Sequence, residues 1–206
     1  MNIKFVDFIN TLDFGAIEMK RKVQLMEYAS LFTKELKKRG ELNLNFICTH
    51  NSRRSHMAQM IAIGLIKYLH IKHFYCHSGG TEVSEIYPTT LSALKEIGFE
   101  IKRSNFEEQV NPKYKIIFNE KTEITAYSKL YNDQSNPQGD FIAVMVCSDA
   151  EKNCPVVPGA SHRVSLTYDD PKEFDGTENE LKAYIDKCHE IGNELYFMFI
   201  LMRKAL

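Results

Sequence analysis

The chain has 206 residues, 44% of them apolar and 26% charged, which is ordinary for a globular domain and allows one well-formed core with appended helices. Its formal net charge of -1 gives no global basic field for nucleic acid or an anionic membrane, so any anion must be bound locally. Its apolar runs are too short to span a bilayer, and its first residues lack a signal-peptide pattern. We therefore expect a cytoplasmic protein without nucleic-acid or membrane partners.

The N-terminal part of the chain has the pattern of helices. Apolar side chains recur there at roughly helical spacing, at Ile17, Val23, Met26, Phe32 and Leu36. Basic residues crowd the end of this stretch and Gly40 follows them, as is typical where a helix stops. We therefore interpret residues 1–43 as an N-terminal helical extension and residues 44–206 as the main domain.

Strand and helix patterns alternate in the next part of the chain. Residues 44–47 form a short apolar segment typical of a strand. Residues 56–69 are rich in apolar side chains and lack proline, which favours a partly buried helix. A second short strand is expected at residues 74–76. Pro88 is placed to begin another helix, and Gly98 is placed to end it.

The region of residues 113–139 is polar and rich in turn residues toward its end. Either a hairpin or an irregular insertion fits this region. Residues 141–146, FIAVMV, then form a continuous apolar run, as expected for a strand at the buried centre of a parallel sheet. A polar loop containing proline follows, and it leads to Asp170 and Pro171.

The C-terminal segment predicts a long amphipathic helix. Thr177 and Glu180 have the spacing of a capping box at its start. One apolar stripe follows, formed by Leu181, Tyr184, Ile185, Cys188, Ile191, Leu195, Met198 and Met202. Together, the alternating elements predict an α/β fold, a three-layer sandwich in which helices flank a central parallel sheet of about four strands.

The chemical centre of the sequence is a polar loop between the first strand and the helix after it. The carboxyl ends of strands are where open α/β sheets bind ligands. Successive backbone N–H groups of such a loop, with the N-terminus of the next helix, can hold a tetrahedral anion. The members of the loop are Cys48, Thr49, His50, Asn51, Ser52, Arg53, Arg54 and Ser55.

Cys48 and Arg54 carry the expected chemistry of this loop. The planar guanidinium of Arg54 matches two oxygens of an oxyanion. The local dipoles are expected to lower the pKa of Cys48 below the free value of about 8.5, and Ser55 can add a hydrogen bond to the sulfur. A thiolate beneath a bound oxyanion is placed for nucleophilic attack. Taken alone, Cys48 and Arg54 equally fit a buried small side chain and a solvated cation.

The chain has five cysteines, an odd number that does not resemble a secreted disulfide framework, so we expect reduced thiols. Cys147 directly follows the strand of residues 141–146 and can face the same crevice as Cys48. Cys154 lies in the polar loop beyond it. The alternatives are a structural pair or a partial metal site, for which His162 is the only close further ligand, and we expect no bound metal.

The segment ICTHNSRRSHMAQ resembles the signature of the low-molecular-weight tyrosine phosphatase superfamily, which includes the thioredoxin-coupled arsenate reductases. Ser78-Gly79-Gly80 resembles the turn that follows the second strand in that superfamily. The resemblance extends from about residue 44 to residue 196, with an interruption near residues 113–139. It implies a phosphatase-like fold and a phosphate-like oxyanion, such as arsenate, as the substrate.

The resemblance implies roles for several residues of the loop. It implies that Cys48 is the nucleophile and that Arg54 is the oxyanion clamp. Asn51 and Ser55 are then the residues that shape the loop and support the thiolate. His50 stands where a glycine is usual, which would strain the backbone if its φ were positive. Arg53 stands where cysteine is frequent and is expected to add positive charge at the mouth of the site.

The stretch CSDAEKNCPVVPG resembles the arsenate reductase branch, and the phosphatase branch lacks it. The implied mechanism begins when Cys48 attacks arsenate. Cys147 then attacks Cys48 and releases arsenite, and Cys154 moves the disulfide outward to Cys147–Cys154. Thioredoxin would reduce that disulfide, because such a relay needs an external reductant and no bound cofactor.

Asp170, directly before Pro171, resembles the general acid of the superfamily, although an Asp-Pro pair on its own is also an ordinary turn. Lys172 follows where the phosphatase branch often has an aromatic residue, which disfavours an aryl phosphate as the substrate. Two other functions stay open. One is a low-molecular-weight phosphatase that hydrolyses phosphoesters, and the other is a non-catalytic module that binds oxyanions or senses redox state.

Overall fold

A parallel four-stranded sheet with strand order β2-β1-β6-β7 forms the centre of the molecule. The structure, a computed structural model, describes residues 2–104, 107, 110–119, 122–154 and 156–206. The strands of this sheet are β1 (Leu42–Cys48), β2 (Phe74–Gly80), β6 (Phe141–Met145) and β7 (Ala160–Ser165). The two inner strands, β1 and β6, pair in parallel and are buried along nearly their whole length.

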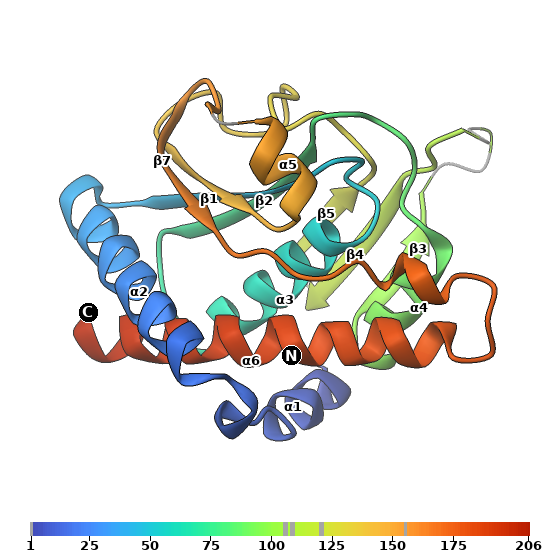
Figure 1. Cartoon of the computed structure of the whole chain (residues 1–206), viewed down its shortest axis with the longest axis horizontal. Helices are drawn as coiled ribbons and strands as arrows, with labels where there is room; N and C mark the ends of the chain where they lie inside the picture. The colour runs from blue at the N-terminus through green and yellow to red at the C-terminus, as the bar shows by residue number, and fades with distance from the viewer. Residues whose placement is uncertain (1, 105–106, 108–109, 120–121, 155) are drawn as a thin grey trace.

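Helices flank this sheet, which confirms the predicted α/β architecture (Figure 1). They include α3 (Arg54–Tyr68), α4 (Pro88–Glu96), α5 (Ser148–Asn153) and α6 (Glu180–Ala205). The long helix α6 runs along one side of the molecule, and α3 lies between it and the sheet, in contact with α6, β1 and β2. The much shorter α5 contacts β1 and β6. Among the described residues, no helix is both long and apolar enough to cross a membrane.

The N-terminal residues form α1 (Ile3–Asn10), the 3-10 helix η1 (Phe14–Ala16) and α2 (Met19–Arg39). Gly40 ends α2 with a φ of 79°, as predicted. The predicted apolar stripe is partly wrong, because Val23 and Met26 are 51% and 53% exposed. The buried face of α2 instead follows Leu25, Ala29, Phe32 and Leu36, whose spacing repeats every three or four residues. These side chains belong to the same hydrophobic core as the sheet.

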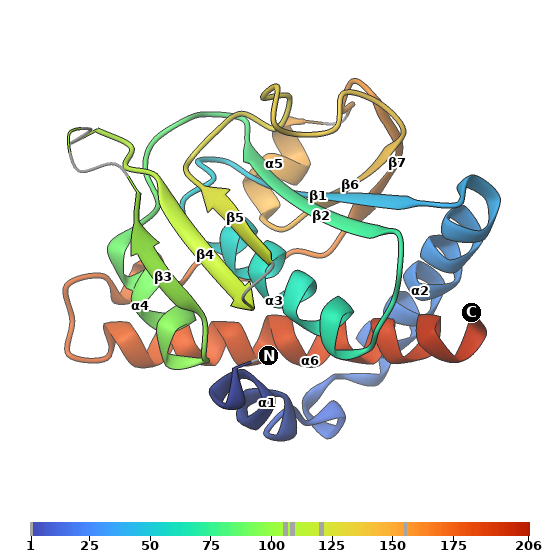
Figure 2. The same cartoon turned by 180° about the vertical axis from the view of Figure 1, so that it is seen from behind.

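A second sheet, antiparallel and ordered β3-β4-β5, lies beside the first (Figure 2). Its strands are β3 (Glu100–Arg103), β4 (Tyr114–Asn119) and β5 (Thr122–Ala126). Of the two alternatives for residues 113–139, the hairpin is therefore confirmed at its start. The chain after the hairpin then runs past the end of β2, where the N–H of Gly80 donates to the carbonyl of Lys129 at 2.8 Å.

Two further local predictions failed. The loop expected after residue 146 contains α5 and β7, which are short and have no strong apolar period that would reveal them. The capping box of α6 is also wrong. Asn179 is the N-cap residue, while the carboxylate of Glu180 accepts from the N–H of Gly176 at 2.7 Å and from the hydroxyl of Thr89 on α4. Thr177 donates instead to the carbonyl of Phe174.

Gly80, at the end of β2, gives a testable consequence of this packing. A Cβ atom there would lie 2.5 Å from the carbonyl oxygen of Thr49 and 2.8 Å from the backbone nitrogen of Asn51. Because both are backbone atoms, Gly80→Ala should lower the free energy of unfolding by about 1–3 kcal/mol in a denaturant titration. Gly139→Ala is the control, since open space surrounds that position. Equal stability of the two variants would contradict this packing.

Candidate active site

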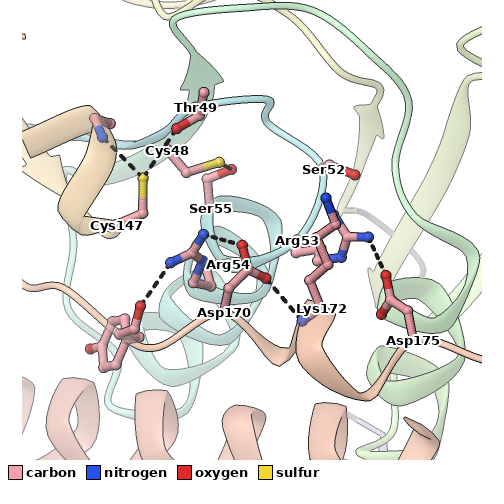
Figure 3. A network of polar contacts seen from close by, with 12 residues as sticks. Cys48, Thr49, Ser52, Arg53, Arg54, Ser55, Cys147, Asp170, Lys172 and Asp175 are labelled. Carbon is pink, nitrogen blue, oxygen red and sulfur yellow. Dashed lines mark hydrogen bonds and ion pairs between the residues drawn. The ribbon is translucent and has the colours of Figure 1, made fainter. Parts of the chain in front are cut away.

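The loop from Cys48 to Ser55 joins the carboxyl end of β1 to α3 (Figure 3). Asn51 is its left-handed residue, with a φ of 46°, and His50 is not among the residues of positive φ. The strain considered for His50 is therefore absent, because the turn falls on asparagine, which tolerates this region well. The Asn51 amide ties the loop together. It donates to the Ser55 hydroxyl at 2.8 Å and accepts from the N–H of Lys129 at 2.9 Å.

The sulfur of Cys48 lies at the base of this loop and is buried. The Ser55 hydroxyl lies 3.1 Å from it, and the N–H of Asn51 donates to it at 3.2 Å. Burial raises the pKa of the Cys48 thiol, and the Ser55 hydrogen bond and the charge of Arg54 act in the opposite direction. The predicted lowering of this pKa is therefore wrong, because the desolvation of the sulfur outweighs its hydrogen bonds and the charge of Arg54.

Arg54 and Asp170 are joined in an ion pair beside the loop (Figure 3). One nitrogen of the Arg54 guanidinium donates to the Asp170 carboxylate, and the other terminal nitrogen donates to the carbonyl of Tyr168 at 2.8 Å. The second carboxylate oxygen of Asp170 accepts from the N–H of Lys172 at 3.1 Å and caps the short helix η2 (Pro171–Phe174). The structure thus brings together Arg54, the expected oxyanion clamp, and Asp170, the expected general acid, although they are far apart in the chain.

Cys147 lies directly beside the Cys48 end of the loop. Ile47 pairs with Met145 in the sheet, so the chain leaves β1 and β6 at neighbouring points. The Cys147 sulfur is 3.6 Å from the Thr49 hydroxyl and accepts from the N–H of Ala150 at 3.3 Å. It is fully buried and close enough to disfavour ionisation of Cys48. The expectation that Cys147 faces the same crevice as Cys48 therefore agrees with its position.

Cys154 stands at the opposite end of α5 from Cys147. Cys154 is half-buried, and its sulfur lies 3.5 Å from the carbonyl of Val156. The segment that contains it was expected to be a polar loop. All five cysteines are free thiols. Among the described residues, no three histidine, cysteine, aspartate or glutamate side chains are grouped so that they could hold a metal ion.

Two other loop side chains, Arg53 and His50, have partners outside the loop. The Arg53 guanidinium donates to the hydroxyl of Tyr184 and to the carboxylate of Asp175, each at 2.6 Å, and lies 4.1 Å from the centre of the Tyr87 ring. Its charge is therefore paired, and the expected free charge at the mouth is not present. His50 is about half exposed, with its Nδ1 atom 3.2 Å from the Glu82 carboxylate. Both side chains thus have partners other than an anion held in the loop.

Residues distant in sequence support the site and were not predicted. Arg21 on α2 forms a bidentate pair with Glu194 on α6 and donates to the carbonyl of Thr167 at 3.3 Å. This holds the segment just before Asp170. Lys129 is buried, with its ammonium 5.0 Å from the centre of the Tyr127 ring. Neither residue has a local sequence signal for this role, because Arg21 contacts remote segments and the N–H of Lys129 donates to the remote Asn51 amide.

The hydrogen bond from Ser55 to the sulfur predicts a measurable shift in Cys48 ionisation. Ser55→Ala removes a contact that favours the thiolate, so the pKa of Cys48 should rise further. Alkylation of Cys48 at pH 7 should then slow about tenfold, with the midpoint of its pH profile moved upward, as followed by peptide mass spectrometry. Ser84→Ala is the control, because that hydroxyl lies 3.3 Å from the carbonyl of His50 and not on the sulfur. An unchanged profile in Ser55→Ala would rule out this role.

Comparison with known proteins agrees with this geometry. Residues 43–117 match the family model for low molecular weight phosphotyrosine protein phosphatase. Arsenate reductase 2 of Staphylococcus epidermidis is 30% identical over 146 residues, which cover 68% of this chain and 91% of that protein. The arsenate reductase of Bacillus subtilis is 30% identical over 151 residues, covering 73% and 89%.

Solved structures show the same fold at lower identity. An arsenate reductase in the phosphate binding state superposes with a TM-score of 0.50 at 18% identity, over 80% of this chain and 99% of that one. A low molecular weight protein tyrosine phosphatase from Bacillus subtilis also has a TM-score of 0.50, at 14% identity, over 79% and 98%. The chain therefore belongs to the low-molecular-weight phosphotyrosine protein phosphatase family, and its arsenate reductase relatives align with two thirds or more of its length.

Proposed function

We propose that this protein reduces arsenate to arsenite through Cys48, Cys147 and Cys154, with thioredoxin as its reductant in the cytoplasm. The observation that carries the proposal is the buried sulfur of Cys147 beside Cys48, at the ends of two paired strands. A phosphatase of this family needs no second thiol, because water hydrolyses its phosphoenzyme. A reductase must take two electrons from protein sulfur, so a second thiol at this position has a direct role.

The loop supplies the binding groups for an oxyanion. Among the first N–H groups of α3, those of His56 and Met57 donate to the carbonyl of Arg53, so the N–H groups before them are the candidates to bind an anion. Arg54 can turn its guanidinium from Asp170 to that anion. The Asp170 carboxyl, released from Arg54 and lying beside the loop, is then placed to protonate the oxygen that leaves arsenate.

The proposed steps conserve electrons and protons. The Cys48 thiolate attacks arsenic and a hydroxide leaves, protonated by Asp170. The Cys147 thiolate then attacks the Cys48 sulfur, so that a disulfide forms and the electron pair of the arsenic–sulfur bond reduces arsenic to arsenite. Finally, the Cys154 thiolate attacks Cys147 and releases Cys48 as a thiolate. Thioredoxin returns two electrons to the Cys147–Cys154 disulfide.

The last exchange requires α5 to change shape. A rise of about 1.5 Å per residue over the seven steps from Cys147 to Cys154 separates their Cα atoms by roughly 10 Å. A disulfide allows a Cα separation of only about 4.4–6.8 Å. Of the six residues of α5, only Ala150 is buried, so little packing opposes its unwinding. A helix this short is also marginal by itself.

Phosphoester hydrolysis is the second candidate function. It is favoured by the complete set of Cys48, Arg54 and Asp170, which serves a phosphoenzyme as well as an arsenic thioester. The relatives named arsenate reductase and the Cys147 thiol beside the loop support the reductase more strongly.

Steady-state assays of cysteine variants test the proposal. Arsenate turnover with thioredoxin and its reductase should fall by at least about a hundredfold in Cys147→Ser and in Cys154→Ser, because neither variant can complete the disulfide relay. Any hydrolysis of p-nitrophenyl phosphate should survive in both, since it needs neither Cys147 nor Cys154. Cys188→Ala is the matched control and should keep full turnover, because that thiol is buried on α6. Wild-type arsenate turnover in Cys154→Ser would refute the relay.

A further inference from the structure

The helix α5 is held from outside by two side chains of β7. The Arg163 guanidinium donates to the carbonyls of Glu151 and Cys154, the latter at 3.1 Å, and lies 3.6 Å from the Glu151 carboxylate. The Ser165 hydroxyl donates to the same carboxylate. Carbonyls in the last turn of a helix lack partners within the helix, and a cation there stabilises it. Arg163 and Ser165 therefore secure the C-terminal half of α5.

The opposite end of α5 is secured by the reacting sulfur itself. Cys147 is the N-cap residue, and its sulfur accepts the hydrogen bond of the Ala150 N–H. When Cys147 turns toward Cys48 to form a disulfide, this cap is lost. The contacts of β7 then remain as the main polar restraint on α5.

We propose that Arg163, Glu151 and Ser165 form a clamp that keeps α5 helical and so controls how readily Cys154 reaches Cys147. The functional meaning of this clamp rests on the proposed arsenate reduction. Arg163 is a positioning residue, since it touches neither the loop that binds the anion nor a reacting sulfur. The clamp holds the two thiols apart in the reduced protein and limits the exchange that produces the outer disulfide.

The N-terminal helices back this clamp. The Tyr28 hydroxyl on α2 lies between the backbone groups of Ser165, donating to its carbonyl at 3.0 Å and accepting from its N–H at 3.2 Å. Gln24 donates to the same carbonyl at 3.2 Å. α2 therefore fixes the β7 residue that holds Glu151, which gives the N-terminal region a role in the redox step.

The clamp is tested without arsenate, by oxidising the protein with diamide on a Cys48→Ser background. Diamide takes two electrons and two protons from Cys147 and Cys154 as their disulfide forms, and mass spectrometry follows the rate. Arg163→Ala should form this disulfide roughly tenfold faster or more, the effect of losing one charge-assisted hydrogen bond. Hydrogen exchange of residues 148–154 in the reduced protein should accelerate in parallel.

Three further variants keep the test decisive. Arg163→Lys should fall between wild type and Arg163→Ala, because lysine keeps the charge but lacks the forked donors. Glu151→Ala should also speed disulfide formation, because it removes the carboxylate that β7 holds. Alanine has a higher helix propensity than glutamate, so an effect of helix propensity alone would slow disulfide formation instead. Lys152 is an exposed cation on the same helix, so Lys152→Ala should form the disulfide at the rate of the Cys48→Ser parent.

Rates and exchange equal to wild type in Arg163→Ala and Glu151→Ala would overturn the clamp. Failure of the proposed function would look different. Wild-type protein treated with arsenate would then form no disulfide, while the diamide rates of the variants would still be ordered as the clamp predicts.

Discussion

The site depends on the parallel pairing of β1 with β6. Parallel neighbours end at the same edge of a sheet, so the residues that follow them meet there. The pairing of Ile47 with Met145 places Cys48 and Cys147 at that edge, although about a hundred residues separate them in the chain. Because both strands are buried, this register cannot slip without exposing the core. The loop, the ion pair and α5 are all attached to this fixed edge.

Around that edge, the two arginines of the loop already form ion pairs with aspartates. Arg54 is paired with Asp170, and Arg53 is paired with Asp175 and Tyr184. The first pair lies beside the loop, and its Asp170 carboxylate is about one third exposed. The second pair anchors the loop to α6 and shows why two adjacent arginines take different roles.

The fold was largely predictable from the sequence, because long apolar patterns such as residues 141–146 report burial directly. The loop from Cys48 to Ser55 was also found, since its residue types lie close together in the chain, and Asp170 was singled out by its resemblance to the aspartate before proline in the superfamily. α5 was not, because SDAEKN is short and polar and is held by Arg163 and Ser165 from another strand. The pKa of Cys48 was predicted in the wrong direction, since burial depends on contacts that no local pattern shows.

The central claim is that electrons pass from Cys48 and Cys147 to a bound oxyanion and that Cys154 then takes over the disulfide. The most direct measurement treats the reduced wild-type protein with one equivalent of arsenate, without an external reductant, and maps its thiols and disulfides by mass spectrometry. The account predicts one arsenite released per chain, a disulfide between Cys147 and Cys154, and a free Cys48. A protein that keeps all its thiols reduced, or forms a disulfide without Cys147, would contradict it.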